Sequence, residues 1–287
     1  MNEETGLIDM DALQAAVTEF RPNILLCGAS GYPRDFDYAR YRQIADSVGA
    51  YLMADIAHIS GLVASQLMNS PFEHCDIVTS TTHKSLRGPR SGIIFCKKEL
   101  ADRINFAVFP MLQGGPHNHQ IGALAIQFKQ VNSAAFKEYS TQVITNARAI
   151  AECLKQAGER LITDGTDTHL LMWDVRPHDL TGSKVDKVLD MMHITVNKNS
   201  VVGDRSAVNP GGIRIGTPAM TTRGMKEPEM ARISQMLLKA IPIAKRIQAA
   251  VGKKLVDFNR AVEVDEEVAT LREEVHAFAR QYPMPGV

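Results

Sequence analysis

The sequence predicts an α/β protein built on a mainly parallel sheet, and two patterns support this. Three short apolar runs, at residues 23–27, 51–55 and 75–80, alternate with segments of helical periodicity. Such alternation is typical of βαβ units, whose strands are buried on both faces. The second pattern is compositional, since 287 residues with 45% hydrophobic and 22% charged side chains can form a sizeable core. This length suits one large domain or two smaller ones.

The elements of the first half follow in order. Residues 1–20 predict a turn and then a short helix, with Asp9 as its N-cap. After the first apolar run, residues 39–50 have the spacing of a helix that buries one face, made of Tyr41, Ile44, Ala45 and Val48. Residues 92–96 form a fourth apolar run, about a dozen residues after the third. Because a parallel crossover needs at least that length, we expect an antiparallel neighbour there.

The second half mixes helices with separate strand-like runs. Residues 119–158 read as helical, and three later runs, 169–175, 194–198 and 212–217, read as strands. Residues 229–242 again have helical spacing. We therefore expect a domain change near residue 140, with a large domain over 1–140 and a small α+β domain over 141–287.

Composition excludes several classes of partner. The 32 basic and 32 acidic residues cancel, so we expect neither nucleic acid nor a membrane surface as the main partner. No apolar run is long enough to span a bilayer, and the N-terminus resembles neither a signal nor a transit peptide. The four cysteines lack metal-ligand or CxxC spacing, which favours a reduced compartment and no metal site.

Polar side chains follow each of the first three predicted strands. Ser30 follows the first, Asp55 and His58 the second, and the third leads into the stretch "TTHK", which contains His83 and Lys84. Ligands of open α/β sheets bind outside the carboxyl ends of the strands. We therefore expect a hydroxyl, a carboxylate, an imidazole and an amine to converge at one sheet edge.

This set of groups suits pyridoxal 5'-phosphate (PLP). Lys84 lies near Arg87 and Arg90, and neighbouring cations favour the neutral amine that a Schiff-base lysine requires. Asp55 could hold the protonated pyridine nitrogen, which keeps the ring an electron sink. The hydroxyls of Ser30 and Thr82 could bond the polar edges of the cofactor. Two glycines, Gly114 and Gly115, offer backbone amides that can approach a phosphate closely.

Each residue taken alone also has a simpler interpretation. Lys84 could be a solvated lysine at a strand exit, and Asp55 could cap the following helix. His58 could be a packed or capping histidine, and the pair Gly114 and Gly115 could form a turn. Their joint placement on successive strand ends is what favours the PLP interpretation.

Several stretches resemble one known family. The motifs "ADIAHISGL", "VTSTTHKSLRGPRSG", "QGGPH", "ITVNKNSV", "GIRIGTPAMTTRG" and the final "FARQYPMPGV" resemble serine hydroxymethyltransferases. These are PLP enzymes of fold type I, the aspartate-aminotransferase fold. The resemblance runs from the start of the chain to its end, and its Thr-His-Lys and Arg-Ile-Gly-Thr-Pro-Ala stretches are specific to the family.

The resemblance implies roles for individual residues of the large domain. Lys84 would carry PLP as a Schiff base, Asp55 would pair with the pyridine nitrogen, and His58 would lie beside the cofactor with Ser30. Thr82 would sit near the lysine, and His83 would support the site.

Further roles involve the second half of the chain and a second subunit. Arg214 would grip the substrate carboxylate, for which the bidentate guanidinium is well suited; taken alone it could be a surface arginine at a strand edge. Asn199 would contact folate. Gly114 and Gly115 would reach the phosphate of a neighbouring subunit in a homodimer or homotetramer with shared active sites.

The implied reaction is the PLP-dependent interconversion of serine and tetrahydrofolate with glycine and 5,10-methylenetetrahydrofolate. The family pattern also includes a long N-terminal segment with further site residues, which this sequence does not contain. We therefore expect a C-terminal portion of the enzyme, with reduced or no activity alone, in the cytoplasm or mitochondria. Two alternatives remain: a non-catalytic fragment or regulatory subunit of the family, and a related fold-type I PLP aldolase.

Overall fold

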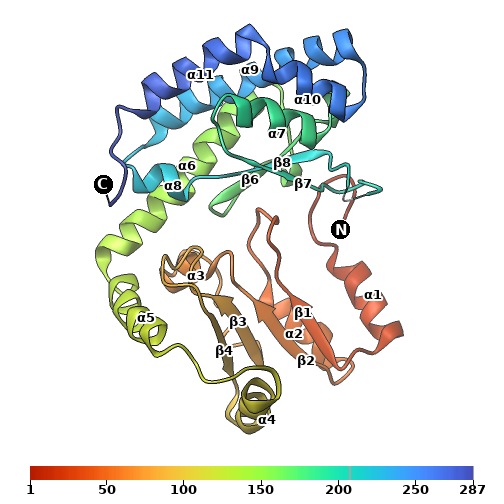
Figure 1. Ribbon diagram of the computed structural model, residues 1–287. Helices are drawn as coiled ribbons and strands as arrows, with labels where there is room; N and C mark the ends of the chain where they lie inside the picture. Colours follow the sequence, from red (N-terminus) through yellow and green to blue (C-terminus); the bar gives the residue numbers. More distant parts are fainter. Residues whose placement is uncertain (207, 287) are drawn as a thin grey trace. The chain divides into compact units, whose positions relative to one another are not determined.

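The chain forms two compact units (Figure 1) in the computed structural model, which describes residues 1–206 and 208–286. The N-terminal unit comprises Asp9–Ser30 and Asp35–Thr141. The C-terminal unit comprises Met1–Ile8, Gly31–Arg34 and the chain from Gln142 onwards. The division falls inside one long helix, α6. Two short segments from the start of the chain thus belong to the C-terminal unit, which the sequence did not indicate.

The N-terminal unit contains a four-stranded sheet in the order β1-β2-β3-β4. Its strands are β1 (Ile24–Cys27), β2 (Tyr51–Asp55), β3 (Ile77–Thr81) and β4 (Gly92–Cys96). The first three are parallel, and β4 pairs with β3 in antiparallel register. The α/β class and the antiparallel return at residues 92–96 are therefore confirmed.

Only one face of this sheet is well buried within the described chain. Leu25, Leu52, Ala54 and Val78 lie on the buried face, and helix α2 packs beside β1 and β2. On the opposite face the exposed apolar side chains are Ile24, Leu26, Tyr51 and Ile94. The prediction of burial on both faces is wrong for these residues, because the described helices do not cover the second face.

The helices of the N-terminal unit begin where the sequence signals predicted. Helix α1 has Asp9 as its N-cap, and the Asp9 carboxylate accepts a hydrogen bond from the Ala12 amide at 2.9 Å. In α2 the predicted face is buried, except that Val48 lies beyond the helix end at Asp46. The α-helices of this part are α1 (Met10–Phe20), α2 (Tyr38–Asp46), α3 (Ser60–Ala64), α4 (Ala101–Phe106), α5 (Asn118–Val131) and α6 (Ala134–Gln156).

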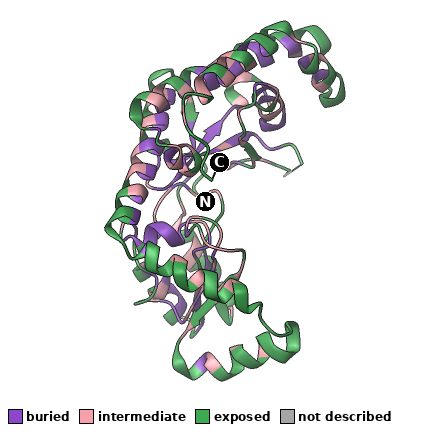
Figure 2. Ribbon diagram, turned by 60° about the vertical axis from the view of Figure 1, so that its left-hand side comes forward, coloured by how far each residue is buried: buried purple, intermediate pink, exposed green. Residues whose placement is uncertain are grey.

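The C-terminal unit packs helices on a second four-stranded sheet, ordered β5-β6-β8-β7 and antiparallel throughout. Every residue of β6 is buried, and this strand is the purple arrow in Figure 2. Its Trp173 packs in a core with Ile213 and Phe258. The strands are β5 (Arg160–Leu161), β6 (Leu170–Asp174), β7 (Asn197–Asn199) and β8 (Gly212–Gly216). The helices are the second part of α6, then α7 (Gly182–Met191), α8 (Pro218–Thr222), α9 (Glu227–Val251), α10 (Leu255–Glu263) and α11 (Glu266–Ala279).

Two further observations concern membrane-spanning helices and metal sites. Among the described residues, no helix combines the length and apolar character needed to cross a membrane. Nor do three His, Cys, Asp or Glu side chains of this part of the chain form a cluster that could hold a metal ion.

Candidate active site

The ends of β1 and β2 lie against each other at the edge where the site is expected. Cys27, the last residue of β1, pairs with Ala54 of β2. The next residue, Gly28, has φ +140°, and a Cβ placed there would lie 2.3 Å from the carbonyl oxygen of Asp55. Only glycine fits this approach. The turn that carries Ser30 therefore starts directly beside Asp55.

Asp55 is exposed and uses one carboxylate oxygen locally. Its Oδ1 accepts a hydrogen bond from the Ala57 amide at 2.9 Å, at the start of the turn that contains His58, and the Ile59 amide closes that turn by donating to the Ile56 carbonyl oxygen. Helix α3 begins later, at Ser60, with Ile59 as its N-cap. Asp55 thus caps the turn, not the helix, and its Oδ2 makes no hydrogen bond with the described residues. That oxygen can accept a hydrogen bond from a ligand.

Two threonines that sequence reasoning missed lie on the same face as Asp55. Thr79 is the register partner of Asp55 across β2 and β3, and Thr81 lies two residues further along β3. Side chains two residues apart in a strand share a face. The hydroxyls of both threonines are buried, and neither has a hydrogen-bond partner within the described chain. Since buried polar groups normally have a partner, these hydroxyls favour a polar ligand at this edge.

The Thr82 hydroxyl makes its contacts within the loop that follows β3. Thr82 is fully buried, and its hydroxyl lies 2.5 Å from the Pro89 carbonyl oxygen and 3.2 Å from that of Ser91. Its amide also donates to Ser91, at 3.0 Å. The one hydroxyl proton is therefore used to close the loop between β3 and β4. Thr82 therefore stabilises the loop, and the neighbouring Thr81 has the buried hydroxyl without a partner among the described residues.

Lys84 lies in this loop, immediately beyond β3. It is exposed, and its ammonium makes no hydrogen bond or ion pair with the described residues. The following Ser85 accepts a hydrogen bond from the Gly61 amide at 3.0 Å. A Cβ on Gly61 would lie 2.3 Å from the Ser85 carbonyl oxygen, so α3 packs tightly against the loop. The backbone around Lys84 is fixed while its amine remains available.

Of the residues near Lys84, His83 has a buried ring nitrogen available to a ligand, whereas Arg87 contacts another side chain of the N-terminal unit. The Nδ1 atom of His83 is buried and has no partner in the part of the chain that the structure describes. The guanidinium of Arg87 lies over the Tyr139 ring, 4.4 Å from its centroid. Arg87 therefore has a cation–π contact of its own within the N-terminal unit.

Gly114 and Gly115 lie in an exposed loop before α5. A Cβ added at either would meet nothing within 4 Å, so no contact inside the chain requires glycine at these positions. Their open surroundings leave the backbone amides accessible.

The C-terminal unit places Arg214 and Asn199 on one face of its sheet. Arg214 in β8 pairs with Asn197 in β7, and its guanidinium donates to the Asn197 side-chain oxygen at 3.0 Å. Asn199 is two residues along β7 and therefore shares that face. Partial burial lowers the pKa of the Arg214 guanidinium from its ordinary value. A cation that is poorly solvated gains more from a carboxylate partner than an exposed one does. Asn197 was missed by the sequence reasoning, although its two-residue spacing from Asn199 could have indicated it.

The structure thus brings the predicted residues together in two sets, one in each unit. The set at the sheet edge of the N-terminal unit consists of Ser30, Asp55, His58, His83 and Lys84, together with Thr79 and Thr81. These groups fit PLP, because an accessible amine, an available carboxylate oxygen and three buried polar atoms without partners match its aldehyde, ring nitrogen and polar substituents.

Comparisons with known proteins point to one family. The family model described as serine hydroxymethyltransferase matches residues 1–237. "Serine hydroxymethyltransferase 4" of Arabidopsis thaliana is 51% identical over 301 aligned residues, which cover 100% of this chain and 64% of that relative. The serine hydroxymethyltransferase of Plasmodium falciparum is 47% identical, covering 97% of this chain and 64% of the relative. That of Bombyx mori is 46% identical, covering 100% and 65%. The chain therefore spans slightly less than two thirds of the length of these relatives. It belongs to the serine hydroxymethyltransferase family.

Proposed function

We propose that this chain forms part of a PLP-dependent glycine hydroxymethyltransferase. The reaction converts serine and tetrahydrofolate into glycine, 5,10-methylenetetrahydrofolate and water, and it runs in both directions. Membership of the family and the two sets of site residues support this proposal.

The residues of the N-terminal unit hold the cofactor. PLP, when bound, supplies an electron sink for the electron pair left at the substrate carbon. Lys84 attaches the cofactor covalently through its amine, which the β3–β4 loop presents where it packs against α3. The Asp55 carboxylate has one oxygen, Oδ2, that the Ala57 amide does not use, and this oxygen would accept a hydrogen bond from the protonated ring nitrogen. A carboxylate there favours the protonated ring.

The other groups at this edge orient the cofactor and exclude water. Thr79 and Thr81 can each donate a hydroxyl proton to its polar substituents, which would satisfy two buried oxygens. The buried His83 Nδ1 can act in the same way. His58 lies in the turn that directly follows Asp55, and we assign to it contact with the cofactor. Ser30 is assigned a hydrogen bond to the cofactor from the adjoining turn.

The residues of the C-terminal unit bind the substrates. Arg214 binds the carboxylate of serine or glycine, and Asn197 orients its guanidinium through the 3.0 Å hydrogen bond. Asn199, on the same face, contacts folate.

The wider architecture is part of the proposal. We assign the fold to type I of the PLP enzymes, with 1–140 in the large PLP-binding domain and 141–287 as the small domain. A homodimer or homotetramer is supported by exposed apolar side chains around the glycine loop, which include Phe109, Met111, Leu112 and Ile121. In that assembly Gly114 and Gly115 approach the phosphate bound by a second copy. The compartment, cytoplasmic or mitochondrial, stays a prediction; names among the relatives include a chloroplastic and a cytosolic form.

The observation that carries the proposal is the accessible Lys84 amine beyond β3, together with buried polar atoms of Thr79, Thr81 and His83 that have no partner among the described residues. Borohydride reduction of the PLP-loaded chain followed by peptide mapping should label Lys84. The variant Lys84→Ala should lose the label, whereas Lys129→Ala, at an exposed lysine on α5 in the same unit, should keep it. A label on another lysine would contradict the assignment.

The activity of the chain is tested separately. Serine cleavage with tetrahydrofolate is measured per bound PLP and compared with that of the full-length Arabidopsis relative, and Lys84→Ala should abolish it. Comparable rates would show that the chain contains every group the reaction needs.

A further inference from the structure

The loop between β3 and β4, residues 82–91, carries Lys84 and packs against two helices besides α3. We call it the lysine loop. Its Leu86 is buried in a small apolar cluster with Val131, the last residue of α5, and Phe136 of α6. All of these residues belong to the N-terminal unit. The position of the lysine loop therefore depends on α5 and α6.

Gln127 of α5 adds a hydrogen bond to this packing. Its side-chain Nε2 donates to the Leu86 carbonyl oxygen at 2.7 Å, and the bond is partly buried. A Cβ placed on Gly88 would lie 3.3 Å from the Cγ atom of Gln127, so the same side chain also lies against the backbone of Gly88. Gln127 thus contacts the lysine loop on both sides of Arg87.

Arg87 has an unusual backbone conformation. Its φ of 61° lies in the left-handed region, which costs energy for a residue other than glycine. Its amide donates to the Lys84 carbonyl oxygen at 2.9 Å and closes the turn that begins at Lys84. The cation–π contact with Tyr139 and the Gln127 bond to Leu86 help to maintain this conformation.

The position of the Lys84 amine depends on this backbone. The amine is exposed and makes no hydrogen bond or ion pair with the described residues, so within that part of the chain the loop backbone directs it. When Lys84 bonds to PLP, the amine nitrogen adds to the aldehyde carbon and the aldehyde oxygen leaves as water. Orientation of the two reacting groups favours such a reaction strongly. A lysine loop that moves more freely therefore forms this bond less favourably.

We propose that Gln127 is a positioning residue for Lys84, which holds the lysine loop at Leu86 and thereby directs the amine toward the aldehyde of PLP. This inference rests on the proposed function, because it takes Lys84 to be the residue that binds PLP. Gln127 itself touches neither cofactor nor substrate in this assignment. Its role differs from that of Thr82, which closes the loop at its β4 end, because Leu86 is only two residues from Lys84.

The test compares two ligands of the whole chain. One is PLP, and the other is pyridoxine 5'-phosphate, which has an alcohol in place of the aldehyde and therefore cannot bond covalently to Lys84. In Gln127→Met the Kd for PLP should rise roughly fivefold, as for the loss of one hydrogen bond that orders the loop before binding. The Kd for pyridoxine 5'-phosphate should remain unchanged, because no bond to Lys84 contributes to it. A loss of general stability would weaken both ligands alike.

Two variants of α5 serve as matched controls. Gln127→Arg retains a side-chain donor that can reach the Leu86 carbonyl oxygen, so its Kd for PLP should lie closer to the wild-type value. Gln130→Met makes the same substitution at an exposed position of the helix and should leave both Kd values unchanged. Amide hydrogen exchange at Arg87 and Gly88 should accelerate roughly fivefold in Gln127→Met and keep the wild-type rate in Gln130→Met.

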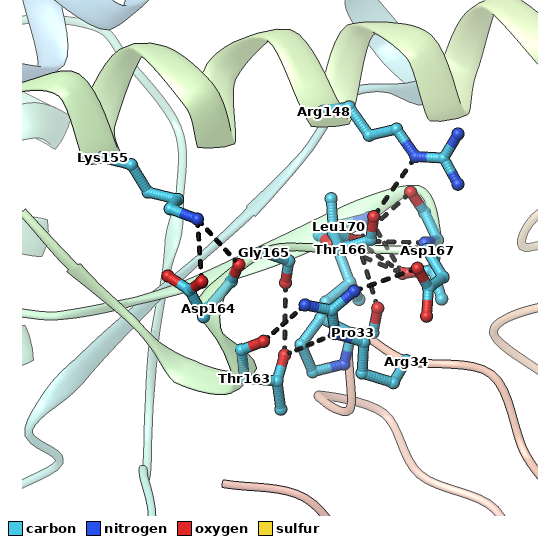
Figure 3. A network of polar contacts seen from close by, with 11 residues as sticks. Pro33, Arg34, Arg148, Lys155, Thr163, Asp164, Gly165, Thr166, Asp167 and Leu170 are labelled. Atoms are coloured by element: carbon cyan, nitrogen blue, oxygen red, sulfur yellow. Dashed lines mark hydrogen bonds and ion pairs between the residues drawn. The ribbon is translucent and has the colours of Figure 1, made fainter. Parts of the chain in front are cut away.

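Arg34→Met is a third control, for the loss of a long-range contact as such. In the C-terminal unit, Arg34 donates to the Thr163 hydroxyl at 3.1 Å and to Asp167 at 3.0 Å (Figure 3). These bonds involve no residue of the lysine loop. Arg34→Met should therefore lower the urea concentration at which the chain unfolds and leave both Kd values unchanged.

Three results decide against the inference or its premise. A wild-type Kd for PLP in Gln127→Met, or an equal rise for both ligands, would overturn the role of Gln127. A rise for PLP in Arg34→Met as large as that in Gln127→Met would also overturn it, since the effect would then follow stability and not the position of Lys84. If the wild-type chain forms no covalent bond between Lys84 and PLP, the proposed function fails instead, and the inference fails with it.

Discussion

Two neighbouring threonines of the "TTHK" stretch provide a direct test of the site, because the structure gives them opposite roles. Thr82→Val removes a hydroxyl that closes the β3–β4 loop. Thr81→Val removes a buried hydroxyl without a partner in the described chain. Valine and threonine have nearly the same shape, so neither change opens a cavity. The two variants therefore differ only in what the hydroxyl does.

The magnitudes follow from these contacts. In Thr82→Val the Pro89 carbonyl oxygen loses its 2.5 Å partner, whereas the Ser91 carbonyl oxygen keeps the Thr82 amide. The loss of this part-buried hydrogen bond, which leaves the Pro89 carbonyl oxygen without its Thr82 donor, should lower the free energy of unfolding by about 1 kcal/mol. In Thr81→Val no hydrogen bond is lost. Burial of a methyl group in place of a hydroxyl should leave the free energy of unfolding unchanged or raise it by up to about 1 kcal/mol.

The assay measures both the urea concentration at which each variant unfolds and its Kd for PLP. Urea unfolding followed by far-UV circular dichroism should show a lower midpoint for Thr82→Val only. Titration with PLP under native conditions should show a Kd raised roughly tenfold for Thr81→Val, as for the loss of one hydrogen bond to a ligand, and little changed for Thr82→Val. The reasoning is refuted if Thr82→Val weakens PLP binding more than Thr81→Val does while unfolding at the wild-type urea concentration.

Three further perturbations test other groups. Asp55→Asn should retain PLP but slow proton exchange at the α-carbon of bound glycine, since an amide does not favour a protonated ring nitrogen; NMR in D₂O measures this exchange, and a wild-type rate contradicts the role. Arg214→Ala should weaken glycine binding by about 1.5–3 kcal/mol while sparing PLP; an unchanged glycine Kd in calorimetry excludes it as the carboxylate clamp. Burial acts to raise the pKa of Asp76, but hydrogen bonds from Lys97, the Leu52 amide and Arg42 outweigh it and leave the pKa below its ordinary value. The unfolded chain therefore takes up the proton first, so this contribution to stability is present above about pH 4 and is lost as the pH falls through the lowered pKa. In the wild-type chain the midpoint of urea unfolding should fall as the pH is lowered below about 4, and in Asp76→Asn it should fall less steeply. An equally steep fall in the variant would show that Asp76 does not cause this pH dependence.

Much of the fold could be predicted from local sequence. The apolar runs identified β1 to β4, and the short return before Gly92 indicated an antiparallel strand, because loop length limits strand direction. The Asp9 cap was also predictable, since its hydrogen bond to Ala12 spans only three residues. Strand β5, with two residues, is too short to produce a periodic pattern.

The position of the candidate site could be predicted from the sequence, but the hydrogen bonds of its individual side chains could not. Sequence placed Asp55, His83 and Lys84 at the strand ends, yet it could not decide between Thr81 and Thr82. That choice depends on which hydroxyl meets the Pro89 carbonyl oxygen, which only the folded loop determines. The partners of Arg34 were equally out of reach, because no local pattern links residues so far apart in the chain.

The separation between Arg34 and its partners has a consequence for the order of folding. Its bonds to Thr163 and Asp167 join residues 129 and 133 positions apart. The entropy needed to close a loop increases with its length, so contacts of this kind form after local ones. On the ribosome, the N-terminal unit is complete once Thr141 has emerged, whereas Gly31–Arg34 must wait for the loop at residues 163–167, beyond α6. The chain can therefore assemble the lysine-bearing sheet first, and Arg34 can bind Thr163 and Asp167 only after that.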